Sequence, residues 1–211
     1  MLFAELDHIT IVAPTLASGV SFVRDRLGVA PQPGGGHPRM GTHNHLMKLG
    51  PKIYLEVIAI NPSAPPPARA RWYGLDRLAV DQPPHLATWI VRTNAIEAAT
   101  AASPVPLGKV EEMTRGALTW RITIPQDGSL PLSGIAPTLI QWPPGVHPAD
   151  KMPDSGCTLV RLEGFHPNPS QVSTMLAAIG FAGEFQVAEL PRGRQPYLAA
   201  HVQSPAGCII L

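Results

Sequence analysis

The chain has 211 residues, of which 45% are hydrophobic and 15% are charged, a composition typical of a globular protein with a substantial core. The formal net charge is +1 and no basic run is present, which makes nucleic acid a poor candidate partner. No apolar run approaches the ~20 residues that span a bilayer, and the first residues lack a signal-peptide pattern. We therefore expect a cytoplasmic protein without a membrane segment, in which Cys157 and Cys208 are buried free thiols.

The first third of the chain is predicted to combine one helix with several strands. Residues 6–13 are rich in β-branched side chains and predict a strand. Apolar residues at helical spacing predict a helix over 17–27, and Gly28 is the expected stop. Two further strands are predicted at 41–49 and 53–60, around a Gly-Pro turn.

The same order of strand, helix and strands returns twice along the chain. The second set is predicted at residues 85–93, 95–102, 110–114, 118–124 and 138–142, with Asn94 as a possible cap of the short helix. The third set is predicted at residues 158–164, 171–179, 185–190, 198–203 and 208–211. Proline-rich stretches at 62–67 and 143–153 separate the sets and are expected to be stiff connectors.

Three βαβββ units predict an α+β fold with a curved mixed sheet around a cleft. Units at residues 1–62 and 83–148 would pair to form the cleft within a first domain, residues 1–148. Residues 154–211 would form a third unit, structural or dimerising. An odd number of units leaves a sheet edge or an apolar face uncovered, so we expect a homodimer. The alternative is a generic α+β sandwich with accidental similarity between the segments.

Four stretches of the sequence resemble the vicinal oxygen chelate superfamily, and in particular its glyoxalase-like group. They are LDHITIVAP at 6–14, PGGGHPRMGTHNHLMKLG at 33–50, YLEVIAIN at 54–61 and LIQWPPGVHP at 139–148. The resemblance implies that His8, Glu56 and Gln141 are metal ligands. At the fourth ligand position of the family the chain has Ala87, and His85 or a water molecule is expected to replace the missing ligand.

Imidazole, carboxylate and amide ligands together suit a divalent ion such as Zn²⁺, Fe²⁺, Mn²⁺ or Ni²⁺. Such an ion would polarise a carbonyl group or stabilise an enediolate. Glu56 is a strong clue because it interrupts an otherwise apolar strand, where an unpaired carboxylate is costly. A structural ion pair between Glu56 and Arg115 or Lys48 is the alternative explanation.

Four further residues are candidates for the site. His37 follows the glycine run 34–36, expected to be a flexible loop, and is predicted to act as acid or base; a residue of the pocket wall and a solvated loop residue are the alternatives. Asn44, Trp142 and Arg115 are predicted to bind the substrate. Alternation along the strand places either Asn44 or the pair His43 and His45 inward, and the resemblance favours Asn44, while Trp142 directly follows Gln141.

These candidate residues are compatible with two classes of function, an enzyme and a binding protein. The first is a metal-dependent enzyme, of lyase, isomerase or dioxygenase type, acting on a small substrate with vicinal oxygens. The second is a metal-free protein that binds or sequesters a small molecule in the same cleft, because a fold alone does not define a reaction. The His8 and Glu56 pair favours the enzyme, whereas Ala87 favours the binding protein.

Overall fold

The computed structural model describes all 211 residues and confirms the α+β class. The helices are α1 (Leu16–Leu27), α2 (Ile96–Ala102) and α3 (Pro169–Ala178). The strands are β1 (Ala4–Val12), β2 (Gln32–His37), β3 (Thr42–Gly50), β4 (Ile53–Ile60), β5 (His85–Thr93), β6 (Lys109–Arg115), β7 (Leu118–Ile124), β8 (Thr138–Gln141), β9 (Thr158–His166), β10 (Phe185–Glu189), β11 (Tyr197–Ser204) and β12 (Gly207–Ile210). None of the helices has the length and apolar character needed to cross a membrane.

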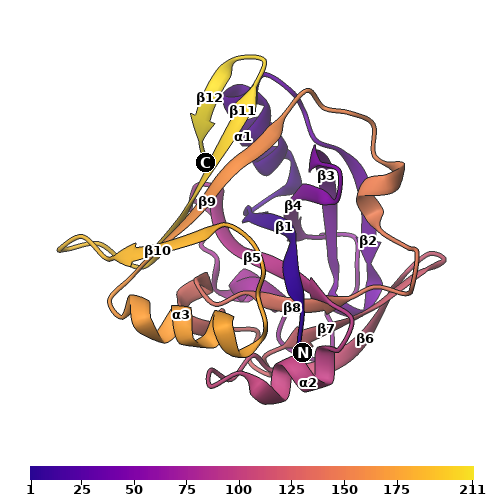
Figure 1. Ribbon diagram of the computed structural model, residues 1–211. Coiled ribbons are helices and arrows are strands. Elements are labelled where there is room, and N and C mark those ends of the chain that lie inside the picture. The colour runs from indigo at the N-terminus through magenta and orange to yellow at the C-terminus, as the bar shows by residue number, and fades with distance from the viewer.

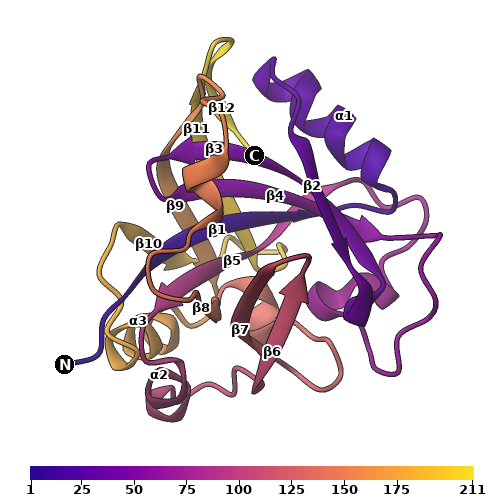
Figure 2. The same ribbon diagram turned by 90° about the vertical axis from the view of Figure 1, so that its right-hand side faces the viewer.

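The first two βαβββ units share one eight-stranded sheet with the order β2-β3-β4-β1-β5-β8-β7-β6. In each unit the first strand pairs in parallel with the last, β1 with β4 and β5 with β8. The units join through the antiparallel pair of β1 and β5 at the centre of the sheet. The sheet curls so that β2 and β6, its two edges, lie on the same side of the molecule (Figure 2). The curl defines an inner face and an outer face.

The edge strand β2 lies where the sequence predicted a flexible loop. Its residues, QPGGGH, have low β-propensity, and the strand exists because it pairs with β3. A Cβ atom at Gly34 would lie 2.9 Å from Leu46 Cγ and closer still to Asn44 Oδ1. The glycine therefore makes room for side chains of the neighbouring strand.

Residues of the third unit form a separate four-stranded sheet with the order β10-β9-β11-β12. Its connectivity differs from that of the first two units, because β9 pairs in parallel with β10, the next strand in the chain. The unit packs against the outer face of the large sheet (Figure 1), where Trp89 of β5 stacks on Phe185 with ring centroids 4.2 Å apart. The third unit thus covers an apolar face of its own chain.

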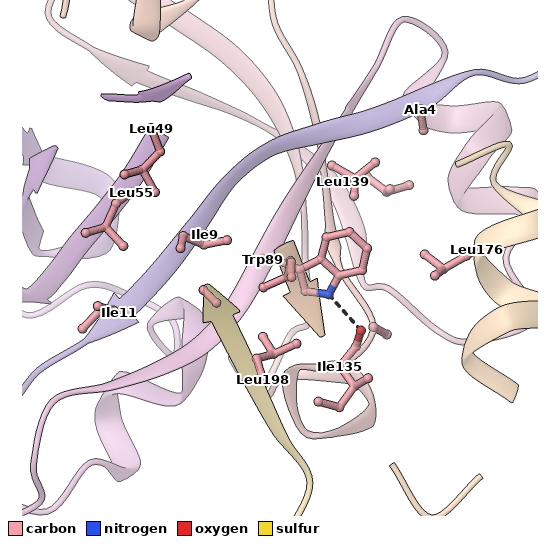
Figure 3. Packing of buried hydrophobic residues seen from close by; sticks show 14 of the residues in the cluster. Ala4, Ile9, Ile11, Leu49, Leu55, Trp89, Ile135, Leu139, Leu176 and Leu198 are labelled. Atoms are coloured by element: carbon pink, nitrogen blue, oxygen red, sulfur yellow. Dashed lines mark hydrogen bonds between the residues drawn. The ribbon is translucent and has the colours of Figure 1, made fainter. Parts of the chain in front are cut away.

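The main hydrophobic core lies between the outer face, the helices and the third unit. Trp89 is fully buried at its centre, and its indole N–H donates to the Ile135 carbonyl at 2.9 Å (Figure 3). Ile9 and Leu139 from the large sheet and Leu198 from β11 pack around it. One predicted thiol is not part of this core: Cys208 is exposed, because it alternates on β12 with inward-facing Ile209.

A second, smaller core lies on the inner face of the large sheet. It contains Ile58 and Ile90 from the central strands and Trp120 from β7. The connector between the first two units, which begins with the proline-rich stretch, brings Trp72, Tyr73 and Leu75 into this core. The connector is therefore a structural part of the inner face as well as a link between units.

Candidate functional site

A small cavity on the inner face brings residues of both units and of the connector together. Its lining consists of His8, His37, Asn44, Tyr54, Glu56, Trp72, Tyr73, Arg115, Trp120, Ile122, Ile140 and Trp142. The space open to the centre of a water molecule is about 20 Å³, so the cavity as it stands holds about one water. Arg115 and Trp142 are its partly exposed members, whereas His8 and Glu56 are buried. A larger ligand must therefore displace a side chain on entry.

Asp7 and His8 both project from β1 to the inner face of the sheet, with His8 at the cavity and Asp7 behind it, because the strand is irregular at Asp7. Leu6 pairs with Val91 of β5 and His8 with Ile90, which leaves Asp7 as an extra residue in the ladder. Such a β-bulge interrupts the alternation of side chains between the two faces of a sheet. His8 Nδ1 lies 2.6 Å from Asp7 Oδ1, and the imidazole stacks on Tyr54 with ring centroids 4.3 Å apart. The orientation of His8 is fixed on two sides.

Asp7 is completely buried and accepts hydrogen bonds from three side chains. Besides His8, these are Trp142 Nε1 at 2.8 Å and His147 Nε2 at 3.1 Å. The backbone N–H of Ala149 donates to His147 Nδ1, so Nε2 carries the proton that His147 donates to Asp7. Burial by itself would raise the pKa of Asp7, but these hydrogen bonds and the positive charge of protonated histidine hold it well below its usual range.

Glu56 faces the cavity from β4, where Tyr54, Glu56 and Ile58 alternate with residues of the outer core. Its Oε2 lies 3.7 Å from His8 Nε2, which is too long for a hydrogen bond and leaves a charge interaction. Thr10 Oγ1 donates to Oε2 at 3.3 Å. Burial would raise the pKa of Glu56, but the contact with His8 and the hydrogen bond from Asn44 lower it to about 2. Glu56 is therefore ionised at neutral pH.

His8 lies between the two carboxylates. Burial would lower the pKa of His8, but its hydrogen bond to Asp7 and the negative charges of Asp7 and Glu56 outweigh this effect and raise it. The imidazole is thus biased toward the protonated form. The ion partner of Glu56 is His8, and the predicted structural ion pair of Glu56 with Arg115 or Lys48 is absent from the structure.

Asn44 links Glu56 to the edge of the cavity. Its Nδ2 donates to Glu56 Oε1 at 2.6 Å, and its Oδ1 accepts from Arg115 Nη1 at 3.2 Å. The side chain of Arg115 passes over β2, where a Cβ atom at Gly35 would lie 3.0 Å from Arg115 Cδ. The glycine run therefore leaves room for Asn44 and Arg115.

His37, at the end of β2, is buried beside Trp72 and Trp120 in edge-to-face geometry. Its Nδ1 lies 3.1 Å from Thr42 Oγ1. Burial lowers the pKa of His37 to about 4, so the ring is neutral at physiological pH. Six predicted site residues thus line one cavity: His8, His37, Asn44, Glu56, Arg115 and Trp142. Their positions are observed, and their roles remain predictions.

Two predicted metal ligands do not reach the cavity. Gln141 shares a face of β8 with Leu139 of the outer core, and its Oε1 accepts from the backbone N–H of Ile96 at 3.0 Å. It thereby caps α2, a role that the sequence suggested for Asn94. The inner-face residue of β8 is Ile140. His85 lies at the start of β5, where its Nδ1 is 3.2 Å from the Pro83 carbonyl, and it lines a different surface pocket.

The inner face does not offer a complete set of metal ligands. His8 and Glu56 supply one imidazole and one carboxylate, but Ala87 and Ile140 supply no donor atom at the remaining strand positions. The second imidazole of the cavity, His37, has its Nε2 atom 3.5 Å from the Asn44 amide nitrogen. No group of three or more His, Cys, Asp or Glu residues in the chain is arranged to hold a metal ion. Catalytic zinc and non-haem iron sites use at least three protein ligands. These residues alone therefore do not fit a resident ion.

Residues that sequence reasoning missed are Asp7, His147, Tyr54, Trp72 and Tyr73. Asp7 precedes His8 directly, but its inward orientation depends on a bulge that leaves no mark in the sequence. Tyr54 could have been found, because it lies two residues before Glu56 and thus on the same face. The connector residues and His147 reach the site only through the tertiary fold.

The sequence matches the model of the glyoxalase-like domain over residues 6–180, and the chain belongs to this family. The family places it in the vicinal oxygen chelate superfamily, which confirms the resemblance seen in the sequence. No curated protein matches the chain.

Several solved structures are similar to this chain. A hypothetical protein from Staphylococcus aureus is similar with a TM-score of 0.60 and 17% identity, over 98% of this chain and 84% of that one. Methylmalonyl-CoA epimerase from Mycobacterium tuberculosis has a TM-score of 0.44 and 14% identity, over 66% of this chain and 88% of its own. A mutant of 4-hydroxymandelate synthase from Streptomyces coelicolor has a TM-score of 0.49 and 13% identity, over 100% of this chain and 62% of its own. The first of these structures shares the fold of this chain.

Proposed function

We propose that this protein is an enzyme of the lyase or isomerase type that moves a proton on a small substrate with adjacent oxygen atoms. The observation that carries this proposal is the pair formed by His8 and Glu56 at the wall of a cavity, with His8 held from behind by Asp7. A positioned acid and base of this kind accelerate proton transfer by about 10²–10⁴-fold.

The two residues supply complementary functions. The ionised Glu56 carboxylate would take a proton from the carbon next to a carbonyl group, and the C–H electron pair would become the C=C bond of an enolate. The carbonyl oxygen would then carry the negative charge, which hydrogen-bond donors in the cavity stabilise. Return of the proton to another position completes an isomerisation without any oxidant. His8, protonated on Nε2, is the donor next to Glu56.

A divalent metal ion is not part of this proposal, because the donor set is incomplete. A ring-cleaving dioxygenase has less support than an isomerase, since the common non-haem iron site needs two histidines and a carboxylate directed at one ion. His85 lies outside the cavity, and the Nε2 atom of His37 lies 3.5 Å from the Asn44 amide nitrogen that bonds Glu56. Metal analysis of untagged protein tests this choice. Stoichiometric zinc, iron, manganese or nickel that is lost in both His8→Ala and Glu56→Ala would contradict it.

Hydrogen exchange in D₂O, followed by proton NMR, tests the reaction. Pyruvate and hydroxyacetone are suitable probes, because both carry exchangeable protons next to a carbonyl and an adjacent oxygen. We expect metal-depleted wild-type protein to accelerate exchange of at least one probe and Glu56→Gln to lose about 100-fold or more of that rate. Glu163→Gln, which removes a carboxylate bonded to His201 in the third unit, is the matched control and should retain full activity.

A binding or sequestering protein is the second candidate, and one observation favours it. Both oxygens of Glu56 already accept hydrogen bonds, and a carboxylate whose pKa is about 2 is a weak base. If calorimetry shows that a probe binds while no exchange is accelerated, this second function replaces the first.

A further inference from the structure

Trp72 carries a buried hydrogen-bond donor that the protein leaves without a partner. The residue is 4% exposed, lines the cavity, and has no acceptor for its indole Nε1 within the chain. A buried donor without an acceptor destabilises a folded protein, so nearly all such groups are paired with protein, water or a ligand. Trp89, by comparison, donates its indole N–H to a backbone carbonyl.

The segment that holds Trp72 has an unfavourable backbone conformation. Tyr73 has a φ of 58°, in the left-handed region that bulky residues rarely adopt. The backbone N–H of Gly74 donates to the Gly128 carbonyl at 2.8 Å, and Asp76 accepts from the backbone N–H of Arg71 at 2.7 Å. These bonds fix the segment, and Tyr73 stacks on Trp72 with ring centroids 5.4 Å apart. Strain that is retained in this way is often found at binding sites.

Arg115 is a cavity cation that no carboxylate neutralises. Its hydrogen-bond partner is the neutral amide oxygen of Asn44, and it forms no salt bridge. Burial raises the pKa of Tyr73 well above its usual range, so the hydroxyl remains protonated and can donate. Trp72, Tyr73 and Arg115 thus line the cavity and each carries a hydrogen-bond donor, whereas Glu56 is an ionised acceptor.

We propose that Trp72 and Arg115 select a substrate with a carboxylate group, which accepts from the indole N–H and pairs with the guanidinium. A guanidinium is well suited to a planar carboxylate, and hydrogen bonds to charged groups are stronger than those to neutral ones. Since the cavity holds about one water, any acid must displace a side chain on entry, and a short acid requires the smallest displacement. A carboxylate held by these donors leaves an adjacent oxygenated carbon for Glu56. This inference deepens the proposed function and rests on the same cavity.

Calorimetric titration of the intact protein with pyruvate, and with its neutral methyl ester, tests the inference through binding alone. We expect wild type to prefer pyruvate to the ester. Trp72→Phe keeps an aromatic ring and removes the N–H, and should weaken pyruvate binding about tenfold or more. Arg115→Gln should abolish the preference for the acid over the ester. Trp89→Phe is the matched control, because it removes an indole N–H outside the cavity and should leave pyruvate affinity unchanged.

Each outcome bears on the inference. Equal pyruvate affinity of wild type and Trp72→Phe would overturn it and indicate that the indole N–H serves a bound water only. No pyruvate binding by wild type at millimolar concentration would also overturn it. Should Trp72→Phe fail to fold, Arg115→Gln provides the test. Loss of its preference for pyruvate over the ester supports the inference, and a preference equal to that of wild type overturns it. If binding depends on both residues but no proton exchange occurs, the carboxylate site stands and only the proposed reaction falls.

Discussion

His8 Nδ1 lies 2.6 Å from the Oδ1 atom of Asp7, its immediate neighbour in the sequence. Adjacent residues of a regular strand point to opposite faces, so this contact exists only because β1 bulges at Asp7. The bulge gives the inner face a carboxylate, an imidazole and a second carboxylate in a row, ending at Glu56. The stability and protonation of the site should depend on Asp7.

Replacement of Asp7 by asparagine should destabilise the protein and change the titration of His8. The substitution removes a buried charge that accepts from three side chains, and we expect the free energy of unfolding at pH 7 to fall by about 3 kcal/mol. Since the negative charge raises the pKa of His8, the variant should also show a lower His8 pKa by NMR titration. Glu163→Gln, at a partly exposed carboxylate, should cost about 1 kcal/mol or less. A stable Asp7→Asn with unchanged His8 titration would contradict this account.

His37 should make stability depend on pH between 6.5 and 4. Burial lowers its pKa from 6.5 to about 4 in the folded state. Protons therefore bind the unfolded chain first, and the contribution of neutral His37 is present above pH 6.5 and lost as the pH falls toward 4. The full loss is on the order of 3 kcal/mol. Urea unfolding at several pH values should show this slope in wild type and a weaker one in His37→Gln; parallel slopes would refute the prediction.

Glu56 acts in a different pH range. Its pKa is lowered to about 2, so its stabilising contribution is present above the unfolded value near 4.5 and is lost as the pH falls through 2. Wild type should consequently lose stability between pH 4.5 and 2 more steeply than Glu56→Gln. Denaturant titration over this range measures both slopes. Equal slopes would mean that Glu56 is not held in its ionised form by the site.

Much of the fold could be predicted from the sequence, because the residue patterns of strands and helices are local and the order of strand, helix and strands repeats. The strands at 53–60, 85–93 and 118–124 have the predicted bounds, and α1 differs from its prediction by one residue. The edge strand β2 was missed because glycine and proline contribute no strand signal, and the pairing with β3 that forms it is tertiary.

Residues of the candidate site could be predicted only where the pattern within a single strand indicated which side chains face the cavity. Glu56 stood out as a charge within an apolar strand. The two-residue alternation left either Asn44 or its histidine neighbours facing inward, and the family resemblance favoured Asn44. Gln141 was misplaced by one position, because β8 has only four residues and both of its faces are buried, which hides the alternation. The residue of β8 that faces the cavity is Ile140, which has no side-chain donor atom, so the set of metal ligands is incomplete.

The predicted homodimer remains to be tested, but its premise has changed. The third unit was expected to leave an apolar face for a partner, and instead it covers the outer face of its own chain, with Trp89 stacked on Phe185. The division of the chain at residue 154 also remains a prediction. Phe185→Ala should lower the free energy of unfolding by about 2–3 kcal/mol without changing the mass measured by light scattering. Dissociation of a dimer by this substitution would show that the unit serves an interface.

Gly34 should be required for the site, although it has no side chain. A Cβ atom there would lie 2.9 Å from Leu46 Cγ and closer to Asn44 Oδ1, so alanine must displace the amide that bonds Glu56. We expect Gly34→Ala to weaken pyruvate binding about tenfold or more while the fold, followed by circular dichroism, persists. Gly36→Ala on the same strand is the matched control, since its Cβ atom would meet only the Thr42 carbonyl oxygen at 3.9 Å. Wild-type affinity in Gly34→Ala, or equal losses in both variants, would show that Asn44 is not held in place by the glycine run. The expected contrast between two alanines two residues apart would instead tie ligand binding to the contact between Asn44 and Glu56.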